Sequence, residues 1–319
     1  MTSSFEREMA VPTSTMSTIA TPRRAHISVC ICTLKRPDLL SRTLASLEGQ
    51  QTSGLFTYSV VVADNDSMES AQQAVAGFSA TSHLPVTYCV EPRQNIALVR
   101  NKAIENAAGD WIAFIDDDEF PAEDWLLNLF KTCTARDADG ALGPVKPHFD
   151  SEPPQWVRKG KFFVRPTRET GYKLGWEESR TGNVLFRRDV LKKLETPFRQ
   201  EFGTAGEDMD FFRRAMDKGC SFVWCNEAVA YEVVPSARCT RSYLLKRALL
   251  RGSNFHKHPA KRLQNIAKSL IAVPSYTLIL PILLLFGQHV FIKYLIKLLD
   301  HSSRLLAYLG VSVVTQRQT

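Results

Sequence analysis

Four consecutive acidic residues stand near the middle of the chain, directly after a wholly apolar segment. The apolar segment is Trp111 to Ile115, and Asp116, Asp117, Asp118 and Glu119 follow it. Adjacent carboxylates repel one another unless a cation neutralises them, and their hard oxygen atoms suit Mg²⁺ or Mn²⁺. A cation held there could bind a diphosphate in turn. The alternative is an acidic surface turn that caps the helix after it.

A second acidic group, Glu207, Asp208 and Asp210, begins a predicted helix that continues through Met216. The helix dipole favours acidic side chains in the first turn, which gives this group a purely structural explanation. A carboxylate that is ionised at neutral pH can instead accept the proton of an attacking hydroxyl. The dipole explains acidic residues at this position but does not explain three of them.

The elements around these acids alternate between predicted strands and predicted helices. This alternation is typical of an α/β fold with a mostly parallel twisted sheet and helices on both faces. We expect residues 151–180 to form a long loop over the site. The expected strands are 27–34, 57–63, 86–90, 111–115, 140–145 and 221–233, and the expected helices include 68–78, 96–107, 206–216 and one from Pro121 through Leu129.

Polar residues fall where three of these strands end. They are Thr33 to Arg36, Asp64 to Ser67, and Asp116 to Glu119. Ligands of parallel α/β sheets bind beyond the carboxyl ends of the strands, so these residues are expected to form one site. The sequence has no Gly-x-Gly-x-x-Gly motif and no phosphate loop ending in Gly-Lys-Ser/Thr, which excludes the common dinucleotide-binding and P-loop classes.

The composition is that of a folded protein in a reducing compartment. Of the 319 residues, 44% are hydrophobic, and the 7 Cys include no Cys-x-x-Cys pair. This pattern argues against a disulfide framework or a structural zinc site. Residues 1–25 are rich in Ser, Thr, Ala and Pro and contain no apolar run. We expect them to be a flexible N-terminal tail, not a secretory signal.

Residues 236–319 differ from the rest of the chain in charge and hydropathy. From Val233 to Leu299 there is no Asp or Glu, against 11 Lys and Arg. Residues 242–251 are predicted to be a basic helix, and 269–292 is a run of 24 residues with His289 as its only Asp, Glu, Lys, Arg or His. Such a run can span a bilayer core of about 30 Å. The combination favours an anionic membrane surface over nucleic acid.

The helix-breaking residues inside the apolar run and the basic residues that flank it predict how the run lies in the membrane. Pro274, Pro281 and Gly287 are expected to break or kink it, and an amphipathic helix is expected at 291–309. Both flanks are basic, and the positive-inside rule keeps basic flanks in the cytoplasm. The run is therefore predicted to lie in the interface of the cytoplasmic face of the inner membrane, or to enter and return with a turn near Pro281 or Gly287.

The motifs, and their order along the chain, resemble those of glycosyltransferase family 2, whose members have the GT-A fold. Within that family the chain is most similar to glucosyltransferases of succinoglycan-type exopolysaccharide assembly. The resemblance implies a GT-A domain at 26–235, followed by a helical membrane-associating region at 236–319. It covers about residues 26–250 and rests on Val29 to Thr33 with Arg36-Pro37, Val62 to Ser67, Asn95 to Ala97 with Arg100-Asn101, Phe114 to Glu119, Thr181 to Asn183, and Gly206 to Asp208.

The resemblance implies roles for the residues expected to bind the donor. Asp116-Asp117-Asp118 matches the D-x-D motif, in which Asp118 binds the metal, Mg²⁺ or Mn²⁺, and Asp116 faces the metal or the ribose. Asp64 would accept a hydrogen bond from a uracil ring, or it is simply a turn residue after a strand. Arg100 would contact the nucleotide, or it is a solvated helix residue. The implied donor-binding set is Thr33, Arg36, Asp64, Arg100, Asp116, Asp117, Arg238 and Arg241.

Further roles concern the acceptor and the leaving group. By the resemblance, Asp208 is the catalytic base, favoured over Asp210, and Glu207 contacts the acceptor. Trp176 could stack on a sugar, with core packing an equally good explanation. Arg238 and Arg241 are three residues apart, share a predicted helix face and could grip a diphosphate. The alternative for this arginine pair is a membrane-facing basic helix.

The function implied by the resemblance is inverting transfer of a sugar from a nucleotide-sugar, expected to be a UDP-sugar, to a lipid-linked saccharide. One alternative is a metal-dependent nucleotidyltransferase, although the glycine-rich phosphate loop typical of that class is not found. The other alternative is a membrane-docked nucleotide-sugar-binding protein without activity. Asp116, Asp118 and Asp208 argue against it, because an inactive site has no need of them.

Overall fold

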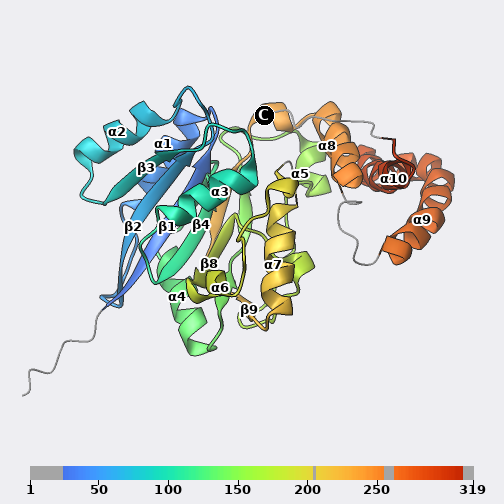
Figure 1. The fold of residues 1–319 in the computed structure, drawn as a ribbon. Helices are drawn as coiled ribbons and strands as arrows, with labels where there is room; N and C mark the ends of the chain where they lie inside the picture. The colour runs from blue at the N-terminus through green and yellow to red at the C-terminus, as the bar shows by residue number, and fades with distance from the viewer. Residues whose placement is uncertain (1–23, 204–205, 255–261, 312–319) are drawn as a thin grey trace, which may run out of the picture.

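A computed structural model describes residues 24–203, 206–254 and 262–311 (Figure 1). The predicted N-terminal tail, apart from residues 24 and 25, lies outside these ranges, as does the end of the C-terminal region from residue 312. The described chain forms an α/β body and a group of C-terminal helices on one side of it.

A seven-stranded sheet forms the centre of the α/β body. Its first four strands are all parallel, and the carboxyl ends of β1, β2 and β4 lie at one edge. β8 then runs antiparallel to its two neighbours, β4 and β6. The mostly parallel sheet predicted from the sequence is therefore confirmed. In spatial order the strands are β3 (Val86–Val90), β2 (Phe56–Asp64), β1 (Ala25–Thr33), β4 (Trp111–Asp116), β8 (Asn183–Arg187), β6 (Gly140–Leu142) and β9 (Phe222–Trp224).

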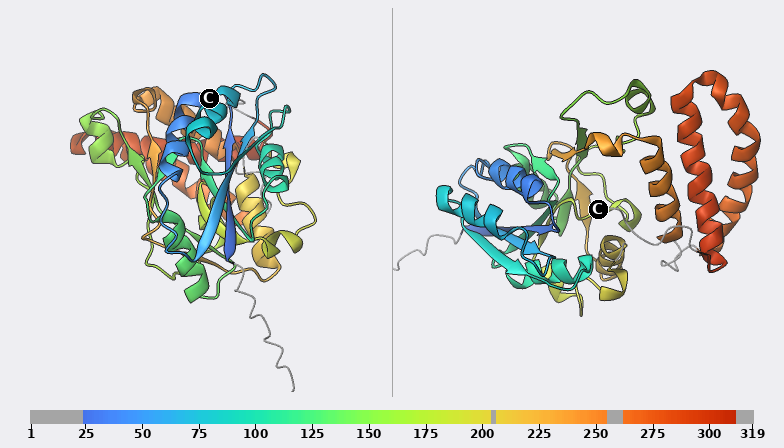
Figure 2. Two further views of the ribbon diagram at one scale, coloured as in Figure 1. Left: turned by 90° about the vertical axis from the view of Figure 1, so that its left-hand side faces the viewer. Right: turned by 90° about the horizontal axis from the view of Figure 1, so that it is seen from above.

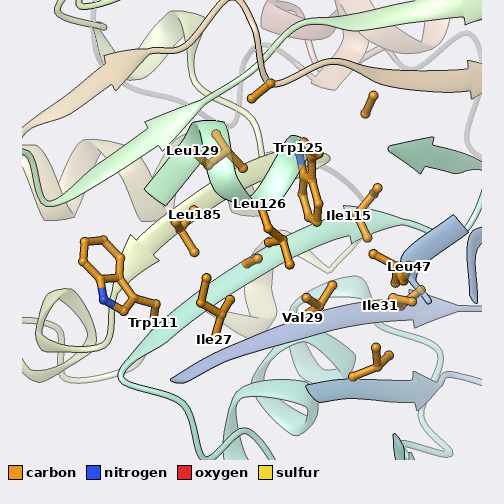
Figure 3. Close-up of a cluster of buried hydrophobic side chains, with 14 of the residues drawn as sticks. Ile27, Val29, Ile31, Leu47, Trp111, Ile115, Trp125, Leu126, Leu129 and Leu185 are labelled. Carbon is orange, nitrogen blue, oxygen red and sulfur yellow. The ribbon is translucent and has the colours of Figure 1, made fainter. Parts of the chain in front are cut away.

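Helices cover both faces of this sheet, as the alternating pattern predicts. Ile27, Val29 and Ile31 of β1 point into one core with α1 (Pro37–Leu47), α2 (Gln72–Thr81) and α4 (Trp125–Ala135), as Figure 3 shows in part. Cys30, between them in sequence, points into a second core with α3 (Ile96–Glu105), α6 (Asp189–Lys192) and α7 (Glu207–Asp217). Strand side chains alternate between faces, so each strand contributes to both cores.

Local sequence fixes where the helices nearest the site begin. Pro37 occupies the first turn of α1, where its missing N–H costs no hydrogen bond. The Asn95 side chain caps α3 by accepting from the backbone N–H groups of Ala97 and Leu98. α1 follows β1 and α3 follows β3 after short connections, so both helices begin near the carboxyl ends of the parallel strands.

A second, three-stranded sheet corrects three predictions. It consists of β5 (Glu119–Pro121), β10 (Ala230–Val233) and β7 (Val145–His148). Pro121 ends β5 and does not begin a helix, and the predicted strands at 140–145 and 221–233 each divide between the two sheets. The division occurs where two backbones come close. A Cβ at Gly143 would lie 2.0 Å from the Ala228 carbonyl oxygen.

The predicted loop at 151–180 contains two short helices, α5 (Gln155–Gly160) and η1 (Trp176–Glu178). The rest of that segment is irregular apart from an isolated bridge between Lys173 and Val223. The loop therefore carries more structure than the sequence pattern indicates.

After η3 (Ser236–Arg238), the C-terminal region forms α8 (Arg241–Asn254), α9 (Arg262–Leu283), η5 (Leu284–Phe286) and α10 (Gln288–Tyr308). Pro274 and Pro281 lie inside α9 without ending it, which corrects the expected break. The chain reverses at Gly287, one of the two predicted positions, where φ is +98° and a side chain would be strained. α10 packs between α8 and α9, and α9 is the outermost helix (Figure 2, right).

Candidate active site

The acidic turn that follows β4 is held in place by β1 and α1. The Thr33 hydroxyl donates to the Asp117 carboxylate at 2.8 Å, and the Thr43 hydroxyl donates to the backbone carbonyls of Asp117 and Glu119. Burial raises the pKa of Asp117 to about 6, although the Arg36 guanidinium opposes the shift. Thr33 and Asp117, both predicted to contact the donor, thus face each other and fix the conformation of the turn.

Two arginines neutralise Asp118 from opposite directions. Arg36, just before α1, lies 3.4 Å from its carboxylate, and Arg238 lies 3.1 Å away. Arg238 also pairs with Glu232 of β10 at 3.2 Å. The predicted metal ligand is therefore already surrounded by the kind of cationic groups that bind phosphate.

The prediction that Arg238 and Arg241 share one helix face is wrong. Arg238 belongs to η3, whereas Arg241 begins α8, and the turn between them points the two side chains in different directions. The Arg241 guanidinium faces the side-chain amide of Gln288 at the start of α10. Of the two arginines, Arg238 is the one that pairs with the acidic turn.

Arg100 links the two acidic groups that the sequence singles out. Its guanidinium pairs with Glu207 of α7 and lies 3.9 Å from Asp116. Only 8% of Arg100 is exposed, so it is not a solvated helix residue. Burial alone would lower its pKa, but Glu207 and Asp116 outweigh burial and raise it, so Arg100 stays charged. Residues about a hundred positions apart are thereby joined in one site.

Asp208 and Asp210 have different surroundings. Asp210 is fully buried and is paired with Arg199, Arg213 and Arg214. Burial would raise the pKa of Asp210, but the hydrogen bonds from Arg199 and Arg214 lower it. Asp208 is half-buried, accepts a 2.7 Å hydrogen bond from the Met209 backbone N–H, and contributes to the field at Arg100. Asp210 thus serves the structure, and Asp208 is left nearer the site.

Two other predicted site residues, Asp64 and Trp176, make contacts within the protein that explain them without a ligand. Asp64 is fully buried and accepts from the Asp66 and Ala71 N–H groups and from the Tyr88 hydroxyl, a pattern that favours the turn alternative. Trp176 packs against the core beneath α7, which favours the packing alternative. A contact from Asp64 to a uracil ring would first need the residue to become exposed.

Glu119 is the acid in this turn whose role the sequence leaves unassigned. It is 1% exposed, and within the described part of the chain neither of its side-chain oxygens has a hydrogen-bond partner. Burial, together with Asp116, raises its pKa well above the usual range. A Cβ at Gly182 would lie 3.0 Å from both Glu119 Oε1 and Asp116 Oδ2, so this glycine leaves room for both carboxylates.

A divalent cation would fit this chemistry with Asp116 and Asp118 as its protein ligands. Both supply hard oxygens, and the carboxyl group of Glu119 lies buried beside Asp116. Across residues 24–203, 206–254 and 262–311, no three His, Cys, Asp or Glu side chains form a ready-made metal cluster. The donor diphosphate would therefore have to supply further oxygen ligands.

Sequence patterns also miss Arg165 and Glu232. Glu232 lies in β10 opposite Glu119 in the strand register, and Arg165 of the 151–180 segment pairs with Glu232. The single charged residue within the strand Ala-Tyr-Glu-Val is the one indication that the sequence offers for Glu232. Nothing in the sequence connects Arg165 to the site, because only the folded loop brings it there.

Comparisons with known proteins identify the family of the chain. The chain is 34% identical to the succinoglycan biosynthesis protein ExoM of Rhizobium meliloti (strain 1021) over 251 residues, which are 76% of this chain and 78% of that protein. The match to the family model for Glycosyl transferase family 2 extends over residues 28–195.

Solved structures show the same fold at low sequence identity. The mannosyltransferase PcManGT of Pyrobaculum calidifontis, in complex with GDP-Man and Mn²⁺, has a TM-score of 0.59 and 19% identity over 89% of this chain and 88% of its own. S. aureus TarS 1–349 in complex with UDP-GlcNAc has a TM-score of 0.51 and 21% identity over 66% and 58%. The extent of the family match, together with the identity to ExoM, shows that this chain belongs to glycosyltransferase family 2 and has the GT-A-like fold expected of it.

Proposed function

We propose that the protein transfers a sugar, with inversion, from a UDP-sugar to a lipid-linked saccharide during synthesis of a cell-surface or extracellular polysaccharide. The observation that carries the proposal is Arg100, which places the acidic turn and the Glu207-Asp208 pair in one site. The similarity to ExoM, a succinoglycan biosynthesis protein, supports the pathway class. The UDP-GlcNAc in the TarS structure supports a UDP-sugar donor.

On the donor side, Asp116 and Asp118 would hold Mg²⁺ or Mn²⁺. The Mn²⁺ in the PcManGT structure supports this cofactor. When bound, the cation stabilises the negative charge that develops on the departing diphosphate. Arg36 and Arg238, which now face Asp118, add positive charge beside the same group. Thr33 and Asp117 keep the turn in position, and Arg100 holds Asp116 toward the nucleotide. Asp64, which is buried, and Arg241, which faces Gln288, would both have to change conformation to contact the donor.

On the acceptor side, Asp208 takes the proton of the acceptor hydroxyl. The hydroxyl oxygen forms a bond to the anomeric carbon while the bond from that carbon to the UDP oxygen breaks, and UDP leaves with the electron pair. Attack from the face opposite UDP inverts the anomeric configuration. Glu207, fixed by Arg100, borders the acceptor side. Trp176 packs against the core and is not given a role in acceptor binding. Asp210 cannot replace Asp208 as base, because three arginines already neutralise it.

The reaction takes place at the cytoplasmic face of the inner membrane, where a lipid-linked acceptor is anchored. Peripheral or re-entrant attachment through α8 to α10 is supported by α9 with η5, which is long and apolar enough to cross a membrane by length and composition. The absence of acidic residues from 233 to 299 supports attachment to anionic lipid.

A panel of nucleotide-sugars tests the donor and the reaction class. The purified full chain is incubated with each donor and Mn²⁺, and release of nucleotide is followed with and without a lipid extract that contains acceptor. We expect one UDP-sugar to be used and the product linkage to have the opposite anomeric configuration by NMR. Retention of configuration, or turnover only of nucleoside triphosphates, would contradict the proposal.

A further inference from the structure

The contact between α9 and α10 includes polar side chains, whereas the exposed side of α9 is apolar. Ser269 of α9 is fully buried, and its hydroxyl lies 2.9 Å from His301 Nδ1 of α10. The Tyr276 ring packs on the rings of Tyr294 and His301, with centroid separations of 5.7 and 6.0 Å. A helix pair in water usually shows the reverse arrangement, with its apolar side chains in contact.

The outer face of α9 and η5 is apolar along its whole length. Leu263, Leu278 and Leu285 are 82%, 78% and 84% exposed. They recur at helical spacing and therefore lie on one side of the helix. The segment Leu263–Phe286 is 24 residues long, and almost none of it is buried. The exposed large apolar side chains are Leu263, Leu270, Ile271, Leu278, Ile279, Ile282, Leu284, Leu285 and Phe286. A continuous apolar face of this length requires an apolar environment.

We infer that α9 lies along the surface of one leaflet of a lipid bilayer, parallel to the membrane plane, with this face in the acyl-chain boundary. The inference deepens the membrane attachment proposed above by choosing between lying along the membrane and dipping into it. It rests on the order of the helices, and it does not depend on which sugar is transferred.

The order of the helices decides the orientation of α9. α10 lies between α8 and α9, and the three helices run side by side (Figure 2, right). The α8–α10 contact includes an ion pair between Arg251 and Asp300, and Ile296 of α10 packs against a small core with Val157 of α5 and Leu244 of α8. If α9 crossed the bilayer, α10 and the basic α8 would have to enter the hydrocarbon beside it. Burying those charges would be costly, so α9 lies flat.

The charges around α9 match an anionic leaflet. Across the described residues from 236 to 311, Asp300 is the only acid, and Arg251 already neutralises it. Lys268 of α9 and Lys293 and Lys297 of α10 are exposed. Lysines at the border of an apolar helix face can extend to lipid phosphates. The occupant of this surface is therefore a bilayer that contains anionic lipid.

Vesicle flotation tests the occupant. The full chain is mixed with vesicles of phosphatidylglycerol and phosphatidylethanolamine, or of phosphatidylcholine alone. We expect flotation with the anionic vesicles and a loss of roughly tenfold or more in Leu278→Asp. Leu55→Asp, the same change at an exposed leucine before β2, is the matched control and should float like wild type. Equal flotation of Leu278→Asp would overturn the inference.

Depth measurements test the orientation. Tryptophan is introduced singly at Leu263, Ile271, Leu278 and Leu285, and quenching by brominated lipids is measured over the wild-type background. Equal, shallow quenching at all four positions is expected for a helix in the membrane plane. Quenching that deepens steadily from one end of α9 to the other would show insertion and overturn the inference.

Two further readouts distinguish lipid attachment from catalysis and from dimer formation. Leu278→Asp should hydrolyse the UDP-sugar at the wild-type rate, because α9 is remote in structure from the acidic turn. A protein that floats but uses no nucleotide-sugar would refute the proposed function alone. Wild-type protein that does not float but forms dimers, which Leu278→Asp dissociates, would instead identify a second copy of the chain as the occupant and overturn the inference.

Discussion

The α/β body and the α9–α10 helices place their apolar and polar side chains in opposite ways. In the body, apolar side chains lie between sheet and helices, and charged groups gather at one edge of the sheet, where Arg100 joins Asp116 to Glu207. Between α9 and α10, polar groups such as Ser269 and His301 face each other, and the leucines of α9 face outward. We therefore expect the two regions to face different surroundings: water and nucleotide phosphate for the body and, as inferred above, lipid for α9.

If this contrast is right, changes at the sheet edge should alter chemistry without altering membrane binding. The largest effect is expected for Asp118→Ala, which should lower transfer by on the order of 10³-fold or more, because a metal ligand contributes several kcal/mol to the transition state. EDTA should stop the wild type, and Mn²⁺ should restore it. Flotation should be unchanged. Asp189→Ala, at an exposed acid paired with Lys192, is the control, and full activity in EDTA would refute the metal assignment.

Asp208→Asn should lower turnover by roughly 10²–10⁴-fold, the usual contribution of a general base. Affinity for UDP, measured by calorimetry, should stay close to that of the wild type, because Asp208 lies in the first turn of α7 and accepts from the Met209 N–H there. Asp210→Asn is the matched comparison two residues away. A larger loss of turnover per folded molecule in Asp210→Asn would show that the wrong carboxylate has been named.

Glu119→Gln should weaken Mn²⁺ binding by roughly 10–100-fold, the range seen when a group behind a metal ligand is changed. The reason is that the Glu119 carboxyl lies buried beside Asp116, where a carboxyl can ionise when a cation binds and an amide cannot. Electron paramagnetic resonance of free Mn²⁺ gives the affinity without any turnover. Unchanged affinity would mean that Glu119 only shapes the turn, and Glu123→Gln, at an exposed acid shortly after β5, controls for net charge.

The smallest effect concerns stability within the body. The pKa of Asp210 is lower in the folded protein than in the unfolded chain, so its contribution is present above the unfolded value of about 4 and is lost as pH falls through the folded value. Asp210→Asn should cost about 1–3 kcal/mol near neutral pH, and it should flatten the acid side of the stability profile. Denaturant unfolding between pH 7 and pH 3 measures both. An equally steep acid loss in the variant would contradict the assignment.

Much of the fold and part of the site follow from sequence patterns. The alternation of apolar strands with amphipathic helices predicts the parallel sheet, and Thr33, Asp64 and Asp116 do end neighbouring strands. Short strands are harder to predict. Gly140–Leu142 and Phe222–Trp224 are too short to show an alternation of apolar and polar residues. The chain leaves one sheet for the other at Gly143 because a neighbouring backbone fills the space there, and a linear pattern carries no information about that neighbour.

The sequence by itself determined which residue types are available: the acids after β4, the acids that begin α7, and a C-terminal segment that is apolar and basic with almost no acids. Only the tertiary structure decided their partners. Asp210 became a structural ion pair because Arg199 and Arg214 surround it, whereas Asp208 stayed nearer the site. Among the residues that the structure describes, Glu119 was left without a hydrogen-bond partner, and α10 came to lie between α8 and α9. These pairings depend on contacts between residues that are distant in the chain. Such contacts form only when the whole molecule packs.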